Sequence, residues 1–170
     1  MLPDPSAFAG MDAAVARLVA AVEAGETIAI FGDYDVDGAT ASAVLQRYFR
    51  MIGGDARVYI PDRLAEGYGP NGPALLRLKS EGVAVVVTVD CGITAFEPLA
   101  EAADAGLDVI VVDHHVAEPR LPRAVAVVNP NRLDDSSGCG QLAAVGVAFM
   151  LVVGLNRSEE HTSELQSHLN

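Results

Sequence analysis

The chain has 170 residues, a hydrophobic fraction of 51% and a formal net charge of -12 at pH 7. This length and hydrophobic content suit one globular domain with a well-formed core. The excess of acidic side chains argues against a protein that holds nucleic acid through general positive charge. The two cysteines, Cys91 and Cys139, lack the paired spacing of a zinc site, and we expect free thiols.

The sequence contains no recognisable targeting or membrane segment. Residues 1–5 lack a basic start followed by an apolar core, so they do not resemble a secretory signal. No apolar run approaches the length needed to span a bilayer. We therefore expect a cytoplasmic protein with no membrane partner.

Apolar runs alternate with helical patterns along the chain. The predicted strands are residues 27–31, 57–60, 83–90, 108–112 and 125–128, and the predicted helices are residues 11–24, 39–51, 73–80, 96–105 and 142–155. The run at 83–90 has no polar alternation, which is typical of a parallel strand that is covered on both faces. The pattern predicts an α/β fold with a largely parallel sheet and helices on both faces, similar to a Rossmann fold.

The composition also predicts the limits of the domain. Residues 1–10 are rich in proline and are expected to form an amino-terminal arm, with the domain itself at 11–157. From residue 158 the chain becomes polar and loses its apolar periodicity. We expect residues 158–170 to be a tail that is either non-native or disordered.

A cluster of carboxylates follows the first predicted strand. Asp33, Asp35 and Asp37 alternate with other residues just before Gly38, at the start of a predicted helix. Three carboxylates this close repel one another unless a cation or donor groups neutralise them, so the loop predicts a metal site. An EF-hand calcium loop is a poor alternative, because Val44 occupies the position of its last glutamate ligand.

Two later strands also end in potential metal ligands. Asp90 follows the second long apolar run, and Asp113, His114 and His115 follow the third. Because the carboxyl ends of parallel strands meet at one edge of the sheet, these side chains are expected to converge with the first cluster. Carboxylates combined with imidazole favour Mn²⁺, for which Mg²⁺ could substitute.

The loop at 61–71 combines both charge signs with glycines and an aromatic residue. Its polar character excludes it from the core, and loops that leave strand ends often carry binding groups. A plain surface connection is the alternative interpretation. We treat Arg63, Glu66 and Tyr68 as candidate substrate-binding residues.

These motifs, in this order, resemble the DHH phosphoesterase superfamily. The resemblance rests on residues 32–38, Val89-Asp90-Cys91-Gly92 and Asp113-His114-His115. The loop at 61–69, the stretch Val128-Asn129-Pro130-Asn131 and the helix beginning at 142 resemble, within it, the amino-terminal catalytic domain of RecJ-type exonucleases. The likeness covers about residues 10–157.

The resemblance implies a phosphodiesterase that uses two Mn²⁺ or Mg²⁺ ions and acts on single-stranded DNA from 5′ to 3′. By position, Asp35 and Asp37 would each hold an ion, Asp90 would bridge both and His114 would be a nitrogen ligand. His115 would contact the scissile phosphate, so the catalytic candidates are Asp90 and His115. Asp33 and Asp113 would be direct ligands or would orient the ligands.

The sequence departs from the family pattern in two ways. Some relatives carry a histidine where this chain has Phe31, and family members have a further metal-binding aspartate and additional domains beyond the last helix. The resemblance therefore implies a domain that is incomplete at its carboxyl end, poorly active alone, and dependent on missing domains for most DNA contacts.

Three other functions are compatible with parts of the pattern. A phosphodiesterase for oligonucleotides or cyclic dinucleotides, or a pyrophosphatase, would use the same metal site. A non-enzymatic scaffold would have no reason to keep carboxylates that repel one another. A dinucleotide-binding Rossmann domain would need a glycine fingerprint after the first strand, where this chain has three aspartates.

Overall fold

A computed structural model of the chain describes residues 2–168, with side-chain environments for residues 2–158. Its centre is a five-stranded sheet with the order β2-β1-β3-β4-β5, in which every neighbouring pair is parallel. The strands are β1 (Thr27–Gly32), β2 (Ala56–Tyr59), β3 (Val83–Val89), β4 (Asp108–Val112) and β5 (Ala126–Val128). This confirms the predicted α/β fold with a parallel sheet.

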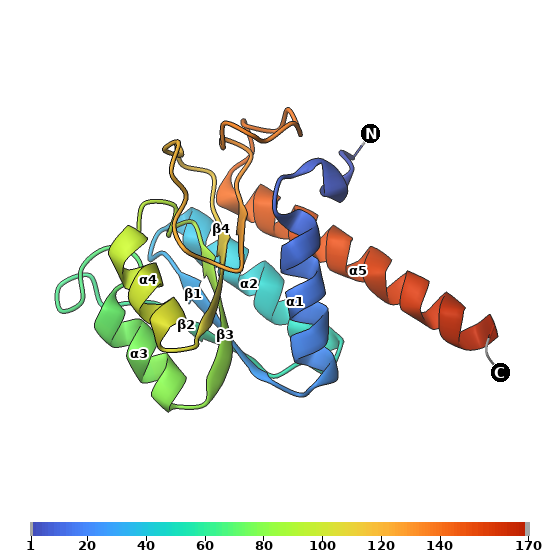
Figure 1. Ribbon diagram of the computed structural model, residues 1–170, viewed down its shortest axis with the longest axis horizontal. Coiled ribbons are helices and arrows are strands. Elements are labelled where there is room, and N and C mark those ends of the chain that lie inside the picture. Colours follow the sequence, from blue (N-terminus) through green and yellow to red (C-terminus); the bar gives the residue numbers. More distant parts are fainter. Residues whose placement is uncertain (1, 169–170) are drawn as a thin grey trace.

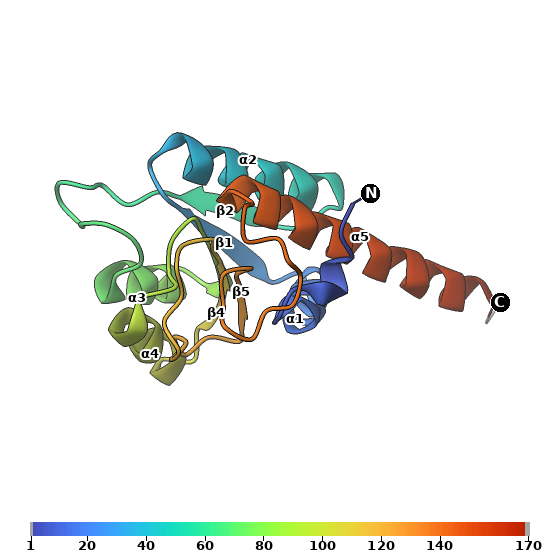
Figure 2. The same ribbon diagram turned by 90° about the horizontal axis from the view of Figure 1, so that it is seen from above.

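Within residues 2–168, five α-helices and one short 3-10 helix surround the sheet. They are η1 (Pro5–Ala7), α1 (Met11–Glu23), α2 (Val36–Met51), α3 (Gly72–Ser80), α4 (Phe96–Asp104) and α5 (Ala144–His168). Helices α1, α2 and α5 cover one face, and α3 and α4 cover the other (Figures 1 and 2).

Alternation along the strands creates two separate cores. In β1, Ile28 and Ile30 point to the face of α1, α2 and α5, whereas Ala29 and Phe31 point to the face of α3 and α4. All four side chains are fully buried. The apolar runs lack polar alternation because both faces of the strands are covered, as expected for parallel sheets.

The order in which strands are added to the sheet reverses between β1 and β3. The chain leaves β1 through α2 on one face to reach β2, then crosses through α3 on the opposite face to reach β3. The loops that follow β1 and β3 therefore diverge at adjacent carboxyl ends. In open α/β sheets this is where ligands bind.

Helix α2 begins at Val36, three residues before its predicted start. Asp35 is its N-cap residue and accepts a hydrogen bond from the Gly38 N–H at 2.9 Å. A side chain added at Gly38 would approach backbone atoms of Asp33 within 2.6 to 2.7 Å. The glycine thus allows the first turn of α2 to pack directly on the end of β1.

The two ends of the chain differ from simple expectation. Residues 2–10 pack on the domain, with Phe8 buried in the core and the Ala9 N–H bonded to Asp135 at 2.8 Å. Helix α5 starts at Ala144 instead of residue 142, and its backbone continues to His168, beyond the predicted end at residue 155. The domain limits at 11–157 and the nature of residues 158–170 stay predictions.

Within residues 2–168, none of the helices is both long and apolar enough to cross a membrane.

Candidate metal centre

The loops after β1, β3 and β4 bring the predicted ligands together at the carboxyl edge of the sheet. Two clusters form, and within each one the potential ligand atoms lie within 4.8 Å of one another. The first contains Asp33, Asp35 and Asp90, and the second contains Asp90, His114 and His115. Asp90 belongs to both clusters, so it lies at the centre of the site.

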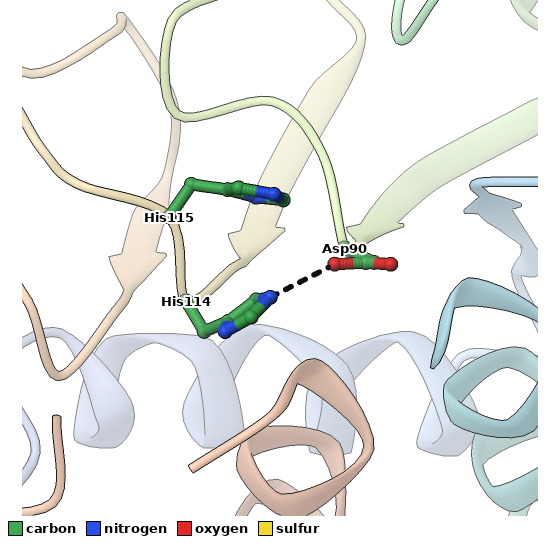
Figure 3. Close-up of side chains that lie close together, drawn as sticks. All are labelled: Asp90, His114 and His115. Atoms are coloured by element: carbon green, nitrogen blue, oxygen red, sulfur yellow. Dashed lines mark ion pairs between the residues drawn. The ribbon is translucent and has the colours of Figure 1, made fainter. Parts of the chain in front are cut away.

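Asp90 points toward the imidazole of His114. Its Oδ1 atom lies 3.2 Å from His114 Nε2, the contact marked by the dashed line in Figure 3. The backbone N–H of Asp90 donates to Val112 of β4 at 3.1 Å, which ties the residue to the neighbouring strand. Among the described residues, Asp90 is the one non-glycine residue with a positive φ, at 62°. Such conformations are strained and are concentrated at functional sites.

Burial and crowding change the acidity of Asp90. The residue is only 2% exposed. Burial raises the pKa of its carboxyl to about 7, and the neighbouring carboxylates of Asp37 and Asp35 act in the same direction. A carboxyl that resists ionisation in this way gains most from a nearby cation.

The other two carboxylates of the first cluster differ in environment. Asp33 is 5% exposed, and its Oδ1 accepts the Tyr34 N–H at 2.7 Å. Burial raises the pKa of Asp33, an effect that the Tyr34 hydrogen bond partly offsets. Asp35 is exposed, and its hydrogen bond from Gly38 lowers its pKa.

Asp37 connects the site to the start of α5. Its two carboxylate oxygens accept the backbone N–H groups of Ala144 at 2.7 Å and Val145 at 2.9 Å. The same Oδ2 lies 3.6 Å from His114 Nε2. Asp37 therefore satisfies helix-terminal N–H groups more than 100 residues away while it faces the metal-ligating candidates.

Asp113 is fully buried and already has hydrogen-bond partners on both oxygens. Its Oδ2 accepts the Ile93 N–H at 3.0 Å, and its Oδ1 accepts the N–H groups of His114 and His115 and lies 2.7 Å from His115 Nδ1. Of the two roles that the sequence left open for Asp113, these contacts favour orientation of the histidines.

The two histidines lie with tilted rings whose centroids are 4.7 Å apart (Figure 3). Burial acts to lower the pKa of His115, but the hydrogen bond and charge of Asp113 outweigh it, so the pKa is raised. The Asp113 contact occupies Nδ1 and leaves Nε2 of this half-exposed ring available.

The loop at 61–71 lies over the same edge of the sheet. The Arg63 guanidinium stacks on the Tyr34 ring at 4.7 Å from its centroid, and the Tyr68 hydroxyl lies 3.5 Å from the Asp90 carbonyl oxygen. Glu66 has a different environment, because it accepts hydrogen bonds from the Tyr59 hydroxyl at 2.6 Å and from Arg77 at 3.1 Å. Arg63 and Tyr68 therefore face the site, whereas Glu66 fixes the loop.

Phe31, noted above as a departure from the family pattern, lies in the core of the domain. Its ring is fully buried and packs against Tyr59 with centroids 5.1 Å apart. This side chain belongs to the core, so the first cluster relies on its carboxylates alone.

Sequence reasoning assigned no role to Asn129 and Asn131. Their side-chain amides donate to the backbone carbonyls of His115 and His114 respectively. The available signal was the position of Asn129 directly after β5, at the same edge of the sheet as the other motifs. Asp135, in the polar loop between β5 and α5, is half-buried and accepts the Ala9 N–H.

The donor set fits a hard or borderline divalent cation. It consists of carboxylates and the imidazoles of His114 and His115. The set has no thiolate, because the Cys91 thiol bonds to backbone carbonyls of Phe31 and Val89. Burial raises the pKa of the Cys91 thiol strongly, which keeps it protonated. These carboxylates and His114 could therefore form a site for Mn²⁺ or Mg²⁺.

Comparison with known proteins identifies the family. A model described as "DHH family, N-terminal domain" matches residues 27–169. The chain belongs to the DHH family. It is 41% identical over 152 residues to the single-stranded-DNA-specific exonuclease RecJ of Bacillus subtilis (strain 168), covering 89% of this chain and 19% of that protein.

Solved structures of DHH-family relatives agree with the fold. The chain matches a crystal structure of exonuclease RecJ bound to manganese with a TM-score of 0.80 and 36% identity, covering 89% of this chain and 38% of that one. It also matches RecJ in complex with Mn²⁺ from Thermus thermophilus, with a TM-score of 0.72 and 32% identity, covering 90% and 22%. The chain thus spans well under half the length of these relatives.

Proposed function

We propose that this chain is a catalytic domain of a metal-dependent exonuclease that hydrolyses phosphodiester bonds in single-stranded DNA from 5′ to 3′. The proposal is supported by relatives named single-stranded-DNA-specific exonucleases and by two structural neighbours that contain manganese. The observation that carries it is the position of Asp90 in both ligand clusters. A single carboxylate shared by two clusters suits a pair of adjacent ions.

The proposed ligands divide around Asp90. Asp33 and Asp35 would complete one ion site, and His114 with Asp37 would complete the other. When bound, two Mn²⁺ or Mg²⁺ ions would lower the pKa of a water molecule and offset the charge of the phosphate. The carboxylate oxygens of Asp37 accept two N–H groups and keep further lone pairs, which are sufficient to coordinate a cation.

His115 has the environment of a phosphate-binding residue. Asp113 holds its Nδ1 and raises its pKa, which favours a positively charged ring that donates from Nε2. Arg63 and Tyr68 would contact the DNA strand beside the cluster. Burial raises the pKa of the Tyr68 hydroxyl, so this group stays a neutral donor.

Hydrolysis of end-labelled DNA tests the proposal. The chain is incubated with single-stranded DNA labelled at the 5′ or the 3′ end, with duplex DNA and with dinucleotides, in the presence of Mn²⁺ or of a chelator. We expect Mn²⁺-dependent release of 5′-terminal nucleotides from single strands. Asp90→Asn and His115→Ala should each lower the rate by about 100-fold or more.

Asp104→Asn is the matched control, because it removes one acidic charge from an exposed ion pair with Arg123. Asp104 is the last residue of α4 and precedes the start of β4, so it lies at the opposite edge of the sheet from the site. Cleavage confined to dinucleotides would instead support the small-substrate phosphodiesterase. Equal hydrolysis by wild type and Asp90→Asn would rule out the proposed centre.

A further inference from the structure

The segment Asp113-His114-His115 leaves the sheet after β4, yet its peptide groups keep hydrogen-bond partners. The Asp113 N–H donates to the Val128 carbonyl at 3.1 Å, which extends the β4–β5 ladder by one bond. The next two N–H groups donate to the side chain of Asp113, at 2.7 Å for His114 and 3.2 Å for His115. From His114 onward, side-chain groups therefore replace the neighbouring strand as hydrogen-bond partners of the backbone.

Two asparagines hold the carbonyl side of the same segment. Asn129 is fully buried, and its Nδ2 donates to the His115 carbonyl at 2.9 Å. Its Oδ1 accepts the Asn131 N–H at 2.8 Å, so both ends of the amide have partners. Asn131 in turn donates through Nδ2 to the His114 carbonyl.

Asn131 also links this turn to the loop before α5. Its Nδ2 lies 3.3 Å from the Gly140 carbonyl. A Cβ added at Gly140 would meet Asn131 Oδ1 at 2.6 Å, so the glycine permits this close approach. The loop that follows leads into Ala144, whose N–H binds Asp37.

We propose that Asn129 and Asn131 are positioning residues for the metal centre. They fix the backbone of His114 and His115 from the carbonyl side while Asp113 fixes it from the N–H side. This double restraint sets the 3.2 Å approach of His114 Nε2 to Asp90 and the exposure of the His115 ring. The inference rests on the proposed function in assigning His114 as a ligand.

The physical reason is preorganisation of the ligand. A histidine on an unrestrained loop would lose backbone freedom when it binds a cation, and this loss would weaken binding. Groups that orient metal ligands without touching the metal typically change metal affinity by about 10 to 100-fold when they are removed. Here the orienting contact acts on the peptide group instead of on the ring.

The test compares Asn131→Ala and Asn129→Asp with wild type by two measurements. Calorimetric titration with Mn²⁺ gives the dissociation constant, and NMR of the metal-free protein reports the ring resonances of His114 and His115. Asn131→Ala removes the donor to His114 at a half-exposed position where folding should persist. Asn129→Asp keeps the acceptor for Asn131 but places an oxygen against the His115 carbonyl.

We expect both variants to bind Mn²⁺ at least about tenfold more weakly and to show broadened or doubled histidine resonances. Asp104→Asn is the control. Asp104 is exposed, pairs with Arg123 at 2.6 Å and precedes the start of β4, at the opposite edge of the sheet from the metal centre. Its Mn²⁺ affinity should stay within about twofold of wild type.

The outcomes separate this inference from the proposed function. If wild type does not bind Mn²⁺, the proposed centre is wrong, and the NMR measurement alone then tests the restraint on the histidines. If Asn131→Ala keeps the wild-type Mn²⁺ affinity and sharp, unshifted ring resonances, the positioning role is overturned. Should Asn129→Asp not fold, Asn131→Ala decides the question, with Gly140→Ala as a third variant that displaces Asn131 sterically.

Discussion

Asp90 combines burial, a left-handed backbone conformation and crowding by other carboxylates. Each of these features costs free energy, and a bound cation would offset the costs of burial and of crowding. The left-handed conformation costs on the order of 1–2 kcal/mol for a residue with a Cβ, although aspartate tolerates it better than most. The surrounding strands hold the residue in place, because its N–H continues the ladder to β4.

The raised pKa of Asp90 predicts how the metal-free protein responds to pH. In the unfolded chain this carboxyl loses its proton near pH 4, whereas in the folded protein it keeps the proton up to about pH 7. Between these values the native state binds more protons, so the free energy of unfolding falls as pH rises. The raised pKa of His115 acts in the same direction, since its contribution is lost above its folded pKa.

Urea unfolding in the presence of a chelator at pH 5 and pH 8 measures this effect. We expect wild type to lose on the order of 2 kcal/mol over this interval. Asp90→Asn should be less sensitive to pH and more stable than wild type at pH 8, whereas the exposed control Asp104→Asn should follow wild type. A wild-type protein that becomes more stable toward pH 8 would show that the crowding of Asp90 is relieved in another way.

Asp113 offers a second residue-level prediction. Asp113→Asn exchanges one acceptor oxygen for an NH₂ group, which must face a backbone or ring N–H. We expect a loss of about 1.5–3 kcal/mol of stability and a lower pKa for His115, because a buried charged acceptor is removed. Thermal unfolding and NMR titration of the His115 ring measure the two effects, and an unchanged His115 pKa would mean that Asp113 does not control this ring.

The positions of the acidic residues could be predicted from the sequence because each follows an apolar run. The end of a buried parallel strand fixes where the next side chain lies to within a few residues. The sequence could not predict that the oxygens of Asp113 accept N–H groups whereas Asp90 belongs to both ligand clusters. This difference depends on which backbone N–H groups lie near each carboxylate, such as the Ile93 N–H, which comes from another loop and donates to Asp113.

At the scale of elements, α2 and α5 meet at the candidate metal centre. Asp37 lies in the first turn of α2 and accepts N–H groups from the first turn of α5. Two helix amino termini thus converge on the acidic cluster, and their partial positive charges favour carboxylates there. The hydrogen bonds from α5 therefore hold the Asp37 side chain in a fixed position beside the cluster.

Asp37→Asn should therefore loosen α5 as well as the site. The amide can accept only one of the two N–H groups, so the other loses its partner at a cost of about 1 kcal/mol. Hydrogen exchange of the Ala144 and Val145 amides, measured without metal, should accelerate by about fivefold or more. Asp12→Asn, in the first turn of α1, is the control, and protection that stays the same in Asp37→Asn would show that α5 does not depend on this contact.

The sheet was more predictable than the ends of the helices. The strand 108–112 was predicted to the residue, because β-branched runs bounded by glycine or polar residues leave little choice. The early start of α2 depends on a cap made by Asp35, a residue that the sequence also offers as a ligand. The burial of Phe8 depends on contacts with α1 and α5 that no local pattern contains.

At the scale of the whole molecule, the charge distribution limits contact with DNA. The chain has 11 basic and 23 acidic residues. Among residues 2–158, six arginines form ion pairs with carboxylates, namely Arg17, Arg57, Arg77, Arg123, Arg132 and Arg157. Phosphate contacts by basic side chains supply most of the affinity of proteins for DNA, so few such contacts are available here.

We therefore expect this 170-residue chain to bind single-stranded DNA weakly and to degrade it without processivity. Binding should depend on Mn²⁺, because cations at the acidic edge would provide the main attraction for a phosphate. The slope of log affinity against log salt should have a magnitude of about 0.7–1.4, which corresponds to one or two phosphate contacts on a single strand. Fluorescence anisotropy with a labelled oligonucleotide, at several salt concentrations, measures this slope.

A trap experiment measures processivity. Labelled single-stranded DNA is mixed with the protein and Mn²⁺, and excess unlabelled DNA is added once digestion has begun. A strand held by one or two phosphate contacts should dissociate after each cleavage, so labelled product should stop accumulating when the trap is added. Continued digestion of the labelled strand over many nucleotides would show that the chain binds DNA far more tightly than its net charge predicts. The prediction of weak binding would then be abandoned.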